Sequence, residues 1–365
     1  MDYLGWTLER EGHFPEAEKL QRQTVELRRR ILGSENPETL STMNSLASTL
    51  NQEGRYPEAE SLVRDTLQRR RRVLGQEDPD TVISMTGLAA VLMDQGHYRE
   101  AETIEREALE ILRRTLGPEH PRTMSTMGDL GIILSAEGRL DEAEKMKRET
   151  LDIESRILGP EHPNTLRVMI NLASTLQEER RFPEAERVLR NALDIERRVL
   201  GQEHPWTLST MNNLVNPLNK QGRWVEGEKF GRETLEIRRR VLGPEHRSTL
   251  MSMGNLASSF MGEGRYADAE KLPRETIEIQ RRRLGPEHPD TAEGVYNLAV
   301  IEEHAGNRDE ALKVLREAIE HGLPPDADLA METDPYLNSL HGDPRFAALV
   351  AEAKKRVPAE TPTSK

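Results

Sequence analysis

The chain has 365 residues, of which 35% are hydrophobic and 32% are charged, and its formal net charge is −13. This acidic excess argues against non-specific binding of nucleic acid, which needs clustered positive charge. There is no cysteine, which excludes disulfides, zinc–thiolate sites and thiol nucleophiles. No apolar run approaches the ~18 residues of a membrane-spanning helix, and the start MDYLGWTLER lacks the pattern of a signal peptide. We therefore expect a cytoplasmic protein that does not enter a membrane.

A repeat of 42 residues runs through most of the chain without insertion or deletion. The dipeptide Leu-Gly marks its copies at Leu32-Gly33, Leu74-Gly75, Leu116-Gly117, Leu158-Gly159, Leu200-Gly201, Leu242-Gly243 and Leu284-Gly285. A second glycine keeps the same spacing at Gly12, Gly54, Gly96, Gly138, Gly222, Gly264 and Gly306, and Arg180 replaces it once. A fixed period of this length indicates a repeat architecture, so the array is interpreted as one continuous object.

Each repeat is predicted to be a pair of helices. In one copy, Asn36 suits an N-cap and Pro37 the first helical position. Apolar residues then follow at helical spacing, and Gly54 fits the left-handed position that ends a helix. A second helix begins near Pro57 and ends on four arginines, Arg69 to Arg72. One such pair cannot bury its apolar stripe alone, whereas stacked pairs can, so the pattern predicts an α-solenoid.

The same signals place the helices of the other copies. First helices are expected to begin near Pro37, Pro79, Pro121, Pro163, Pro205, Arg247 and Pro289. Second helices are expected to begin near Pro15, Pro57, Arg99, Asp141, Pro183, Val225, Ala267 and Asp309. Aromatic residues recur just before the second helices, at Phe14, Tyr56, Tyr98, Phe182, Trp224 and Tyr266. We interpret this column as packing between repeats and not as a stack for a cofactor.

The order and spacing of Leu46, Ala47, Leu50, Gly54, Tyr56 and Ala59 resemble those of tetratricopeptide repeats. The longer unit, with its PETLSTMNSLASTL and LGPEHP-type segments, resembles the 42-residue version found in kinesin light chains and in many bacterial and fungal repeat proteins. The resemblance covers about residues 1–320. It implies an all-α, right-handed solenoid of about eight helix pairs, but it says little about function.

The ends of the array depart from the repeat. Repeat one lacks the start of its first helix, so we expect that the chain is a piece of a longer protein or starts late. After Gly322 the repeat is lost, and a short helix around 335–340 and a longer one over 344–356 are predicted to cover the end of repeat eight. The expected organisation is a repeat array at 1–322, capping helices at 323–357 and a disordered tail at 358–365.

Two prolines fall inside predicted helices: Pro217 in repeat six and Pro273 in repeat seven. An interior proline costs about 3 kcal/mol and kinks a helix. Two interpretations stay open, sequence drift that the fold tolerates and a change of superhelix curvature that serves function. The sequence favours drift.

Motifs for catalysis are missing: there is no GxxxxGK[ST], HExxH or GxSxG. Five histidines share one repeat position, at His120, His162, His204, His246 and His288. Metal ligands must converge, whereas successive repeats are separated by about 20 Å. Asn36 and Asp78 occupy the same position, so these histidines are predicted to be N-caps. We expect no enzyme activity, no cofactor and no metal.

The arginine clusters that end the second helices, such as Arg238 to Arg240, recur beside an acidic loop residue such as Glu245. We interpret them as structural and not as a nucleic-acid patch.

In the family that the chain resembles, the first helices line the concave surface. The corresponding exposed positions here are those of Ser41, Asn44, Ser45, Ser48, Asn51 and Gln52. The Ser45 position holds Asn171, Asn213, Asn255 and Asn297 in later repeats. Asparagine can pair with the backbone of an extended peptide of any sequence, and in the family it commonly does so. The alternative is a solvated polar face with hydrogen bonds between neighbouring helices.

The densest polar cluster is in repeat six, with Arg167 of repeat five expected nearby. The candidate residues for binding a peptide or partner are Arg167, Asn171, Ser209, Asn212, Asn213, Asn216, Asn219, Lys220, Asn255 and Asn297. Only Arg167 and Lys220 are basic, which argues against the clamp for C-terminal carboxylates that some arrays use on heat-shock chaperones.

The sequence therefore predicts a non-catalytic scaffold that binds a protein or peptide in a concave groove. The second hypothesis is a sensor or self-association arm of a larger signalling protein, such as one with a kinase, cyclase or nucleotide-binding domain. The tail resembles the endings of bacterial repeat proteins, some of which carry such domains.

Overall fold

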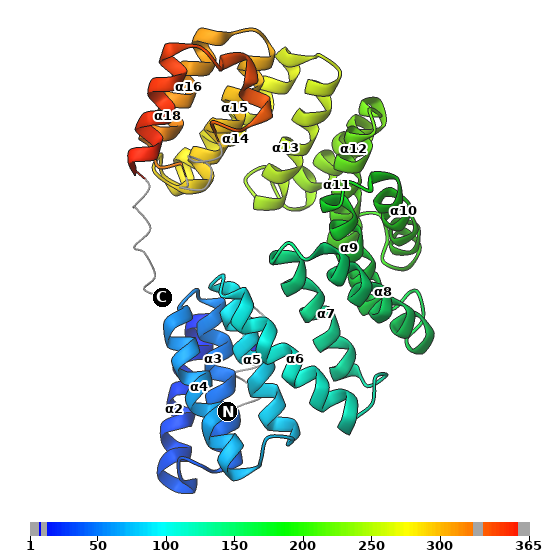
Figure 1. Cartoon of the computed structure of the whole chain (residues 1–365), viewed down its shortest axis with the longest axis vertical. Coiled ribbons are helices and arrows are strands. Elements are labelled where there is room, and N and C mark those ends of the chain that lie inside the picture. Colours follow the sequence, from blue (N-terminus) through cyan, green and yellow to red (C-terminus); the bar gives the residue numbers. More distant parts are fainter. Residues whose placement is uncertain (1–6, 9–12, 324–330, 357–365) are drawn as a thin grey trace. The chain divides into compact units, whose positions relative to one another are not determined.

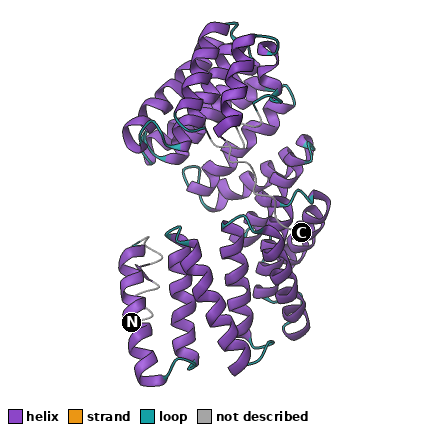
Figure 2. Cartoon of the chain, turned by 60° about the vertical axis from the view of Figure 1, so that its left-hand side comes forward, coloured by secondary structure: helices purple, strands orange, loops and turns teal. Residues whose placement is uncertain are grey.

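A computed structural model of the chain describes residues 7–8, 13–323 and 331–356. Every regular element in these ranges is a helix and none is a strand (Figure 2). No helix within these ranges has both the length and the apolar character needed to cross a membrane. The expected tail at 358–365 and most of the incomplete start of repeat one lie outside the described residues.

The chain divides into two compact units, Met1–Arg181 and Phe182–Lys365. The first unit contains α2 (Phe14–Leu32), α3 (Pro37–Gln52), α4 (Tyr56–Val73), α5 (Pro79–Asp94), α6 (Tyr98–Thr115), α7 (Pro121–Ala136), α8 (Leu140–Ile157) and α9 (Pro163–Glu178). The second contains α10 (Phe182–Val199), α11 (Pro205–Lys220), α12 (Trp224–Val241), α13 (Arg247–Gly262), α14 (Tyr266–Leu284), α15 (Pro289–His304), α16 (Arg308–Glu320), the 3₁₀ helix η1 (Pro335–Leu340) and α18 (Pro344–Arg356). Within each unit each repeat helix packs on the next (Figure 1), which confirms the predicted stacking of helix pairs.

The first helices begin at the predicted residues because side chains cap them. Asn36 Oδ1 accepts a hydrogen bond from the Glu38 amide at 2.9 Å. At the five histidine positions, Nδ1 accepts the equivalent amide hydrogen bond, for example from Arg122 to His120 at 3.2 Å. Nδ1 therefore takes the acceptor role of an N-cap side chain. The predicted capping role is confirmed.

The Leu-Gly marker is explained by its glycine, which has a positive φ in every copy, such as 93° at Gly33. A column of buried threonines, which the sequence analysis did not single out, bonds to these same glycines. Thr39 Oγ1 donates to the carbonyl oxygen of Gly33 at 2.9 Å, and Thr81 does the same to Gly75 at 2.7 Å. The bond recurs in every later repeat, through Thr123, Thr165, Thr207, Thr249 and Thr291. It satisfies a carbonyl group in the loop between repeats and fixes where the next first helix begins.

The second helices begin one residue earlier than predicted, at the aromatic column itself. These side chains do pack between repeats. A Cβ atom placed on Gly262 of α13 would overlap the ring of Trp224 from α12, and Tyr98 packs against the core cluster that several repeats of the first unit share. The interpretation of the aromatic column as inter-repeat packing is confirmed at these positions.

The glycines between the two helices of a repeat have positive φ, such as 74° at Gly54, which side chains other than glycine rarely adopt. Arg180, which replaces glycine at this position, is the one non-glycine residue with positive φ in the described chain, at 60°. The turn is otherwise unchanged, since the Arg181 amide still donates to the Leu176 carbonyl at 2.8 Å. The unchanged geometry of the turn thus holds Arg180 in a left-handed backbone conformation that is usual for glycine.

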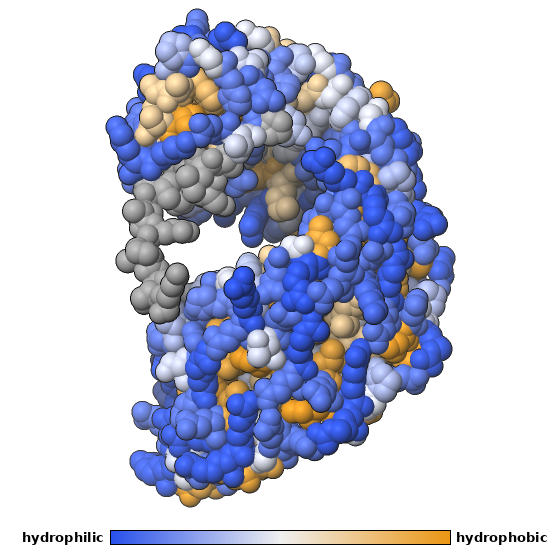
Figure 3. All heavy atoms as spheres, in the orientation of Figure 1, coloured by the Kyte–Doolittle hydropathy of each residue, from blue (hydrophilic) through white to orange (hydrophobic). Residues whose placement is uncertain are grey.

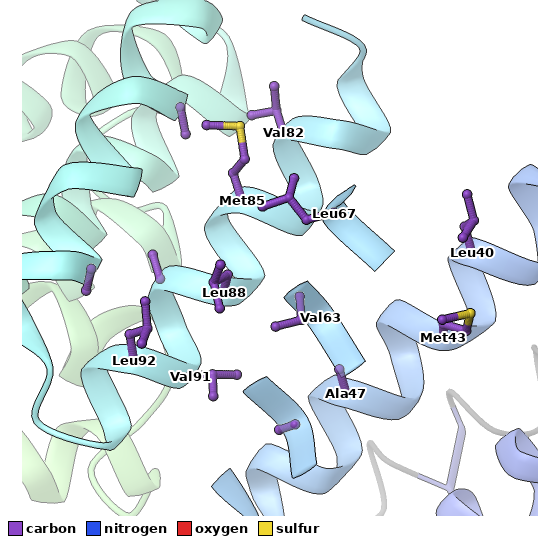
Figure 4. Close-up of a cluster of buried hydrophobic side chains, with 14 of the residues drawn as sticks. Leu40, Met43, Ala47, Val63, Leu67, Val82, Met85, Leu88, Val91 and Leu92 are labelled. Carbon is purple, nitrogen blue, oxygen red and sulfur yellow. The ribbon is translucent and has the colours of Figure 1, made fainter. Parts of the chain in front are cut away.

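The core lies between helices of neighbouring repeats. In the first unit, Val63 and Leu67 of α4 lie between Met43 of α3 and Met85 of α5 (Figure 4). These four side chains are at most 4% exposed. The face of the molecule drawn in Figure 3 is largely hydrophilic, with scattered apolar patches. Burial of this stripe requires a neighbouring repeat, as the sequence predicted.

The arginine clusters tie repeats to their neighbours through up to three kinds of contact. In two repeats one arginine is buried: Arg70 donates to the Asp80 carbonyl at 2.7 Å and to Ser84 Oγ at 2.9 Å, and Arg238 makes the equivalent contacts. The next reaches forward 36 residues, as in Arg113–Glu149 at 2.7 Å. The last reaches back 37 residues, as in Arg114–Glu77 at 2.6 Å. Each exposed ion pair contributes about 0–1 kcal/mol to folding stability. These arginine–glutamate pairs therefore fix the alignment of neighbouring repeats more than they stabilise the fold.

Both interior prolines lie inside continuous helices, Pro217 in α11 and Pro273 in α14. The Pro217 carbonyl accepts a hydrogen bond from the Gln221 side chain at 2.9 Å. Glu53 and Thr49 occupy the same two repeat positions, and there the Glu53 backbone amide donates to the Thr49 carbonyl. In repeat six the Gln221 side chain replaces the backbone amide as the donor.

The C-terminal cap forms as predicted. Phe346, Leu349 and Val350 of α18 are at most 6% exposed and join Leu315 and Ile319 of α16 in one apolar cluster. They cover the end of repeat eight.

The Arg180 turn yields a stability prediction. A non-glycine residue in the left-handed region costs about 1–2 kcal/mol, part of which glycine loses again through its unfolded-state entropy. Arg180→Gly should therefore raise the melting temperature by a few degrees, measured by circular dichroism. The matched control is Gly138→Arg, at the same turn position with φ of 74°, which should lower it. A melting temperature that Arg180→Gly leaves unchanged or lowers would contradict this account of the turn.

A buried carboxyl group in the first unit gives a second prediction. Glu105 of α6 is 1% exposed, neither of its carboxylate oxygens has a hydrogen-bond partner, and Val63 and Leu189 occupy its position in other repeats. Burial, and secondarily the Asp129 carboxylate, raises the pKa of Glu105 well above its usual value. Its destabilising effect is absent below the unfolded-state pKa and grows as pH rises through the folded-state pKa.

Glu105→Val should therefore raise the melting temperature at pH 7.5 by several degrees and by less at pH 5. The control is Glu110→Gln, at an exposed residue of the same helix. This substitution should leave the melting temperature unchanged at both pH values. Equal gains for Glu105→Val at both pH values would show that the carboxylate charge is not the cause.

Candidate functional site

The first helices present most of the expected positions to solvent. Ser41, Ser45, Ser48 and Gln52 of α3 are exposed and Asn44 is half-buried. The expectation for the Asn51 position is wrong, because Asn51 is 8% exposed. Its Nδ2 donates to Asp94 Oδ2 of the next repeat at 2.6 Å, so Asn51 itself ties two repeats together and is not open to a partner.

Five of the ten candidate residues line one cavity of about 550 Å³ in the second unit. They come from three successive first helices: Asn216, Asn219 and Lys220 from α11, Asn255 from α13 and Asn297 from α15. The apolar part of the wall consists of Val215, Trp224, Ala257, Met261, Pro273, Val300 and Ile301. Polar groups on an apolar wall are the usual composition of a binding site.

A second cavity of about 550 Å³ continues this surface between repeats seven and eight. It shares Gly254, Pro273 and Asn297 with the first cavity. Nothing lies within 4 Å of a Cβ atom placed on Gly254, whereas other repeats carry Asn44, Ile170 or Tyr296 at this position. The missing side chain leaves room, and the two cavities together form the groove of the second unit.

Two candidate residues are buried inside the repeat packing. Asn212 is 3% exposed, and its carbonyl oxygen accepts a hydrogen bond from Asn255 Nδ2 at 3.4 Å. Asn219 is 5% exposed, and its Oδ1 accepts from Ser259 Oγ at 3.1 Å. A Cβ atom on Gly227 would overlap Asn219 Oδ1, so Asn219 fills the space of the alanine methyl that other repeats have there. Both residues thus take part in packing between α11 and α13.

The other candidates have separate environments. Ser209 Oγ accepts a hydrogen bond from the buried Arg238 at 3.2 Å, and Asn213 is half-buried and does not line the cavity. Arg167 and Asn171 lie on α9 of the first unit. There, burial raises the pKa of Asp129 and of Glu154, and the Arg167 guanidinium opposes both shifts. The structure therefore brings together Asn216, Lys220, Asn255 and Asn297 as the accessible part of the predicted cluster.

Groove residues that sequence reasoning missed include Tyr296, His304 and, from the C-terminal cap, Asp334 and Tyr336. Tyr296 is the one aromatic residue at its repeat position, which holds Asn44, Ile170 or Gly254 elsewhere, and it could have been noticed on that ground. Tyr336 lies outside the repeat, and no periodicity connects it to the groove.

No cluster of three or more histidine, aspartate or glutamate side chains in the described part of the chain could hold a metal ion. The first cavity offers amides, an ammonium, hydroxyls, an imidazole and the Asp334 carboxylate, and the wall of the second also carries carboxylates and guanidinium groups. These groups suit hydrogen bonding to a polar chain such as a peptide backbone.

The comparisons with known proteins agree with the fold. A model of the tetratricopeptide repeat family matches residues 2–72, 39–114, 80–153, 134–195, 170–216 and 253–321. A second model of the same description matches residues 207–248. No curated protein matches the sequence significantly.

Several solved structures are similar. A protein of nearly identical TPR-like repeats from Podosopora anserina, assigned to a kinesin light chain, is 26% identical over 55% of this chain and 94% of that chain, with a TM-score of 0.50. A Rap protein complexed with competence and sporulation factor is 13% identical over 97% of this chain and 96% of that chain, with a TM-score of 0.59. A signal transduction ATPase with numerous domains and a tetratricopeptide repeat sensor, from Pyrococcus horikoshii, is 16% identical over 93% of this chain and 49% of that chain, with a TM-score of 0.58.

Proposed function

This chain belongs to the tetratricopeptide repeat family, and we propose that it is a non-catalytic cytoplasmic scaffold that binds a peptide or an extended segment of a partner protein in the groove of its second unit. The observation that carries the proposal is the convergence of Asn216, Lys220, Asn255 and Asn297 on one cavity. These residues come from three successive repeats, so an occupant of the groove would meet them in turn.

The chemistry of the groove supports an extended peptide as the occupant. An extended backbone carries unpaired N–H and C=O groups, and each asparagine amide can donate to one and accept from the other. The apolar wall around Trp224, Met261 and Pro273 could bury partner side chains, at about 25 cal/mol per Å² of apolar surface removed from water. The amides would orient a partner, and the apolar wall would supply most of the affinity.

A protein of the same fold, the Rap protein, is known in complex with competence and sporulation factor. This supports binding as a use of the fold.

The second candidate function is the sensor or self-association arm of a larger signalling protein. The Pyrococcus horikoshii ATPase favours it, because that protein carries a tetratricopeptide repeat sensor and this chain's likeness covers 49% of it. In this case the groove would bind the signal or another segment of the larger protein.

The groove is tested by the double variant Asn255→Ala/Asn297→Ala. Partners are recovered on the immobilised protein and identified by mass spectrometry, and the affinity of the purified partner is then measured by calorimetry. An unmade hydrogen bond in a partly desolvated groove costs about 1–3 kcal/mol, so the affinity should fall tenfold or more.

The matched control is Asn171→Ala/Asn213→Ala, which changes the same repeat position outside the cavity and should keep parental affinity. Circular dichroism should show the same melting temperature for both double variants, because the Asn255 bond to Asn212 is long. Parental affinity in the groove variant would place the partner elsewhere. Unfolding of the groove variant would instead show that these asparagines are structural ties.

A further inference from the structure

The C-terminal cap reaches back into the groove. Lys220 Nζ donates to the Tyr336 hydroxyl at 2.9 Å and lies 5.6 Å from the centroid of the Tyr336 ring. The two residues are 116 positions apart, one on α11 of repeat six and the other on η1 of the cap. The contact therefore passes over the two repeats that separate α11 from the C-terminal end.

Further contacts bind the start of η1, from Asp334 to Tyr336, to the second unit's repeats. The Tyr296 hydroxyl of α15 donates to Asp334 Oδ2, while Asp334 Oδ1 accepts from the Tyr336 amide at 2.8 Å. The rings of His304 and Tyr336 lie 5.8 Å apart. One carboxylate thus starts the turn of η1 and also binds it to the inner helix of repeat eight.

These contacts lie in the cavity that the partner would use. Asp334 and Tyr336 line the same cavity as Asn216, Asn255 and Asn297. Lys220 and Tyr296, two of the polar groups on its wall, already bind the cap. A partner that needs these groups must compete with the chain's own segment.

The cap segment that contains η1 has a buried part and an exposed part. Leu337 and Leu340 are 0% exposed and belong to the apolar cluster of the cap, whereas Tyr336 is 46% exposed. Polar contacts at such exposure contribute little net stability because water replaces them. The leucines can keep the cap folded while Asp334 and Tyr336 leave the groove.

We propose that Asp334–Tyr336 is an autoinhibitory strap, which occupies the C-terminal end of the groove and must be released before a partner gains full access. The proposal rests on the proposed function for its biological meaning, but the strap itself can be tested without a partner. Because a tethered segment competes at a high effective concentration, even weak contacts reduce the apparent affinity of an incoming chain.

The absence of cysteine allows a direct test with a single thiol. Asn216 lines the cavity one helical turn from Lys220, so Asn216→Cys places a thiol beside the strap. The probe is fluorescein maleimide, whose labelling rate is measured with and without Asp334→Ala/Tyr336→Ala. Removal of the strap should raise the rate at least threefold.

The matched control is Ser48→Cys, at the same repeat position in the first unit, whose rate should be unchanged. Hydrogen exchange over Pro344–Arg356 should show that the cap remains folded. If the double variant loosens the cap, Tyr336→Phe, which removes only the hydroxyl, should still raise the rate by a smaller factor. Equal labelling rates with an intact cap would overturn the strap.

A partner recovered in the groove experiment gives the second measurement. Asp334→Ala/Tyr336→Ala should bind it at least threefold more tightly than the parent. Faster labelling with unchanged affinity would overturn autoinhibition while leaving the groove assignment intact. If instead Asn255→Ala/Asn297→Ala binds normally, the proposed function fails, whatever the labelling rates show.

Discussion

The structure depends on one constraint: a single pair of these amphipathic helices cannot bury its apolar stripe, so every repeat must cover its neighbour. The exact 42-residue period follows from this need. Arginine–glutamate contacts reach forward 36 and back 37 residues, and the threonine–glycine bond sets each loop, so an inserted residue would break several contacts at once. Because the frame is kept, equivalent residues of successive first helices face the same side, and any binding surface is built from a repeated position.

The candidate groove arises where this regular frame has exceptions. Gly227 lacks the methyl group that other repeats have, and Asn219 turns inward to fill the space. Gly262 allows the Trp224 ring to pack closely, while Gly254 leaves open space beside Pro273 and Asn297. These departures fall in repeats six and seven, and both repeats contribute to the wall of the first cavity. The regular positions hold the array together, and the irregular ones give it a surface on which a partner could bind.

Much of this could be predicted from the sequence because its signals are local and repeated. The N-cap followed by proline placed the first helices to the residue, and the proline starts at 335 and 344 placed the cap helices. The second helices were predicted one residue late because the aromatic residue is itself the first helical position. Asn51, Asn212 and Asn219 were assigned to an open face because burial depends on neighbouring repeats. The contact of Tyr336 with Lys220 joins two parts of the chain that share no period, so no sequence pattern indicated it.

We propose that the groove is the functional surface of the array and that it arises from departures from the regular repeat. Hydrogen–deuterium exchange of the full chain, with and without its purified partner, tests this claim most directly. The account predicts new protection on the inner helices α11, α13 and α15, together with faster exchange at 334–336 as the strap is released. Protection confined to the first unit, or to α10 and α16, which contribute no residue to the groove, would contradict it.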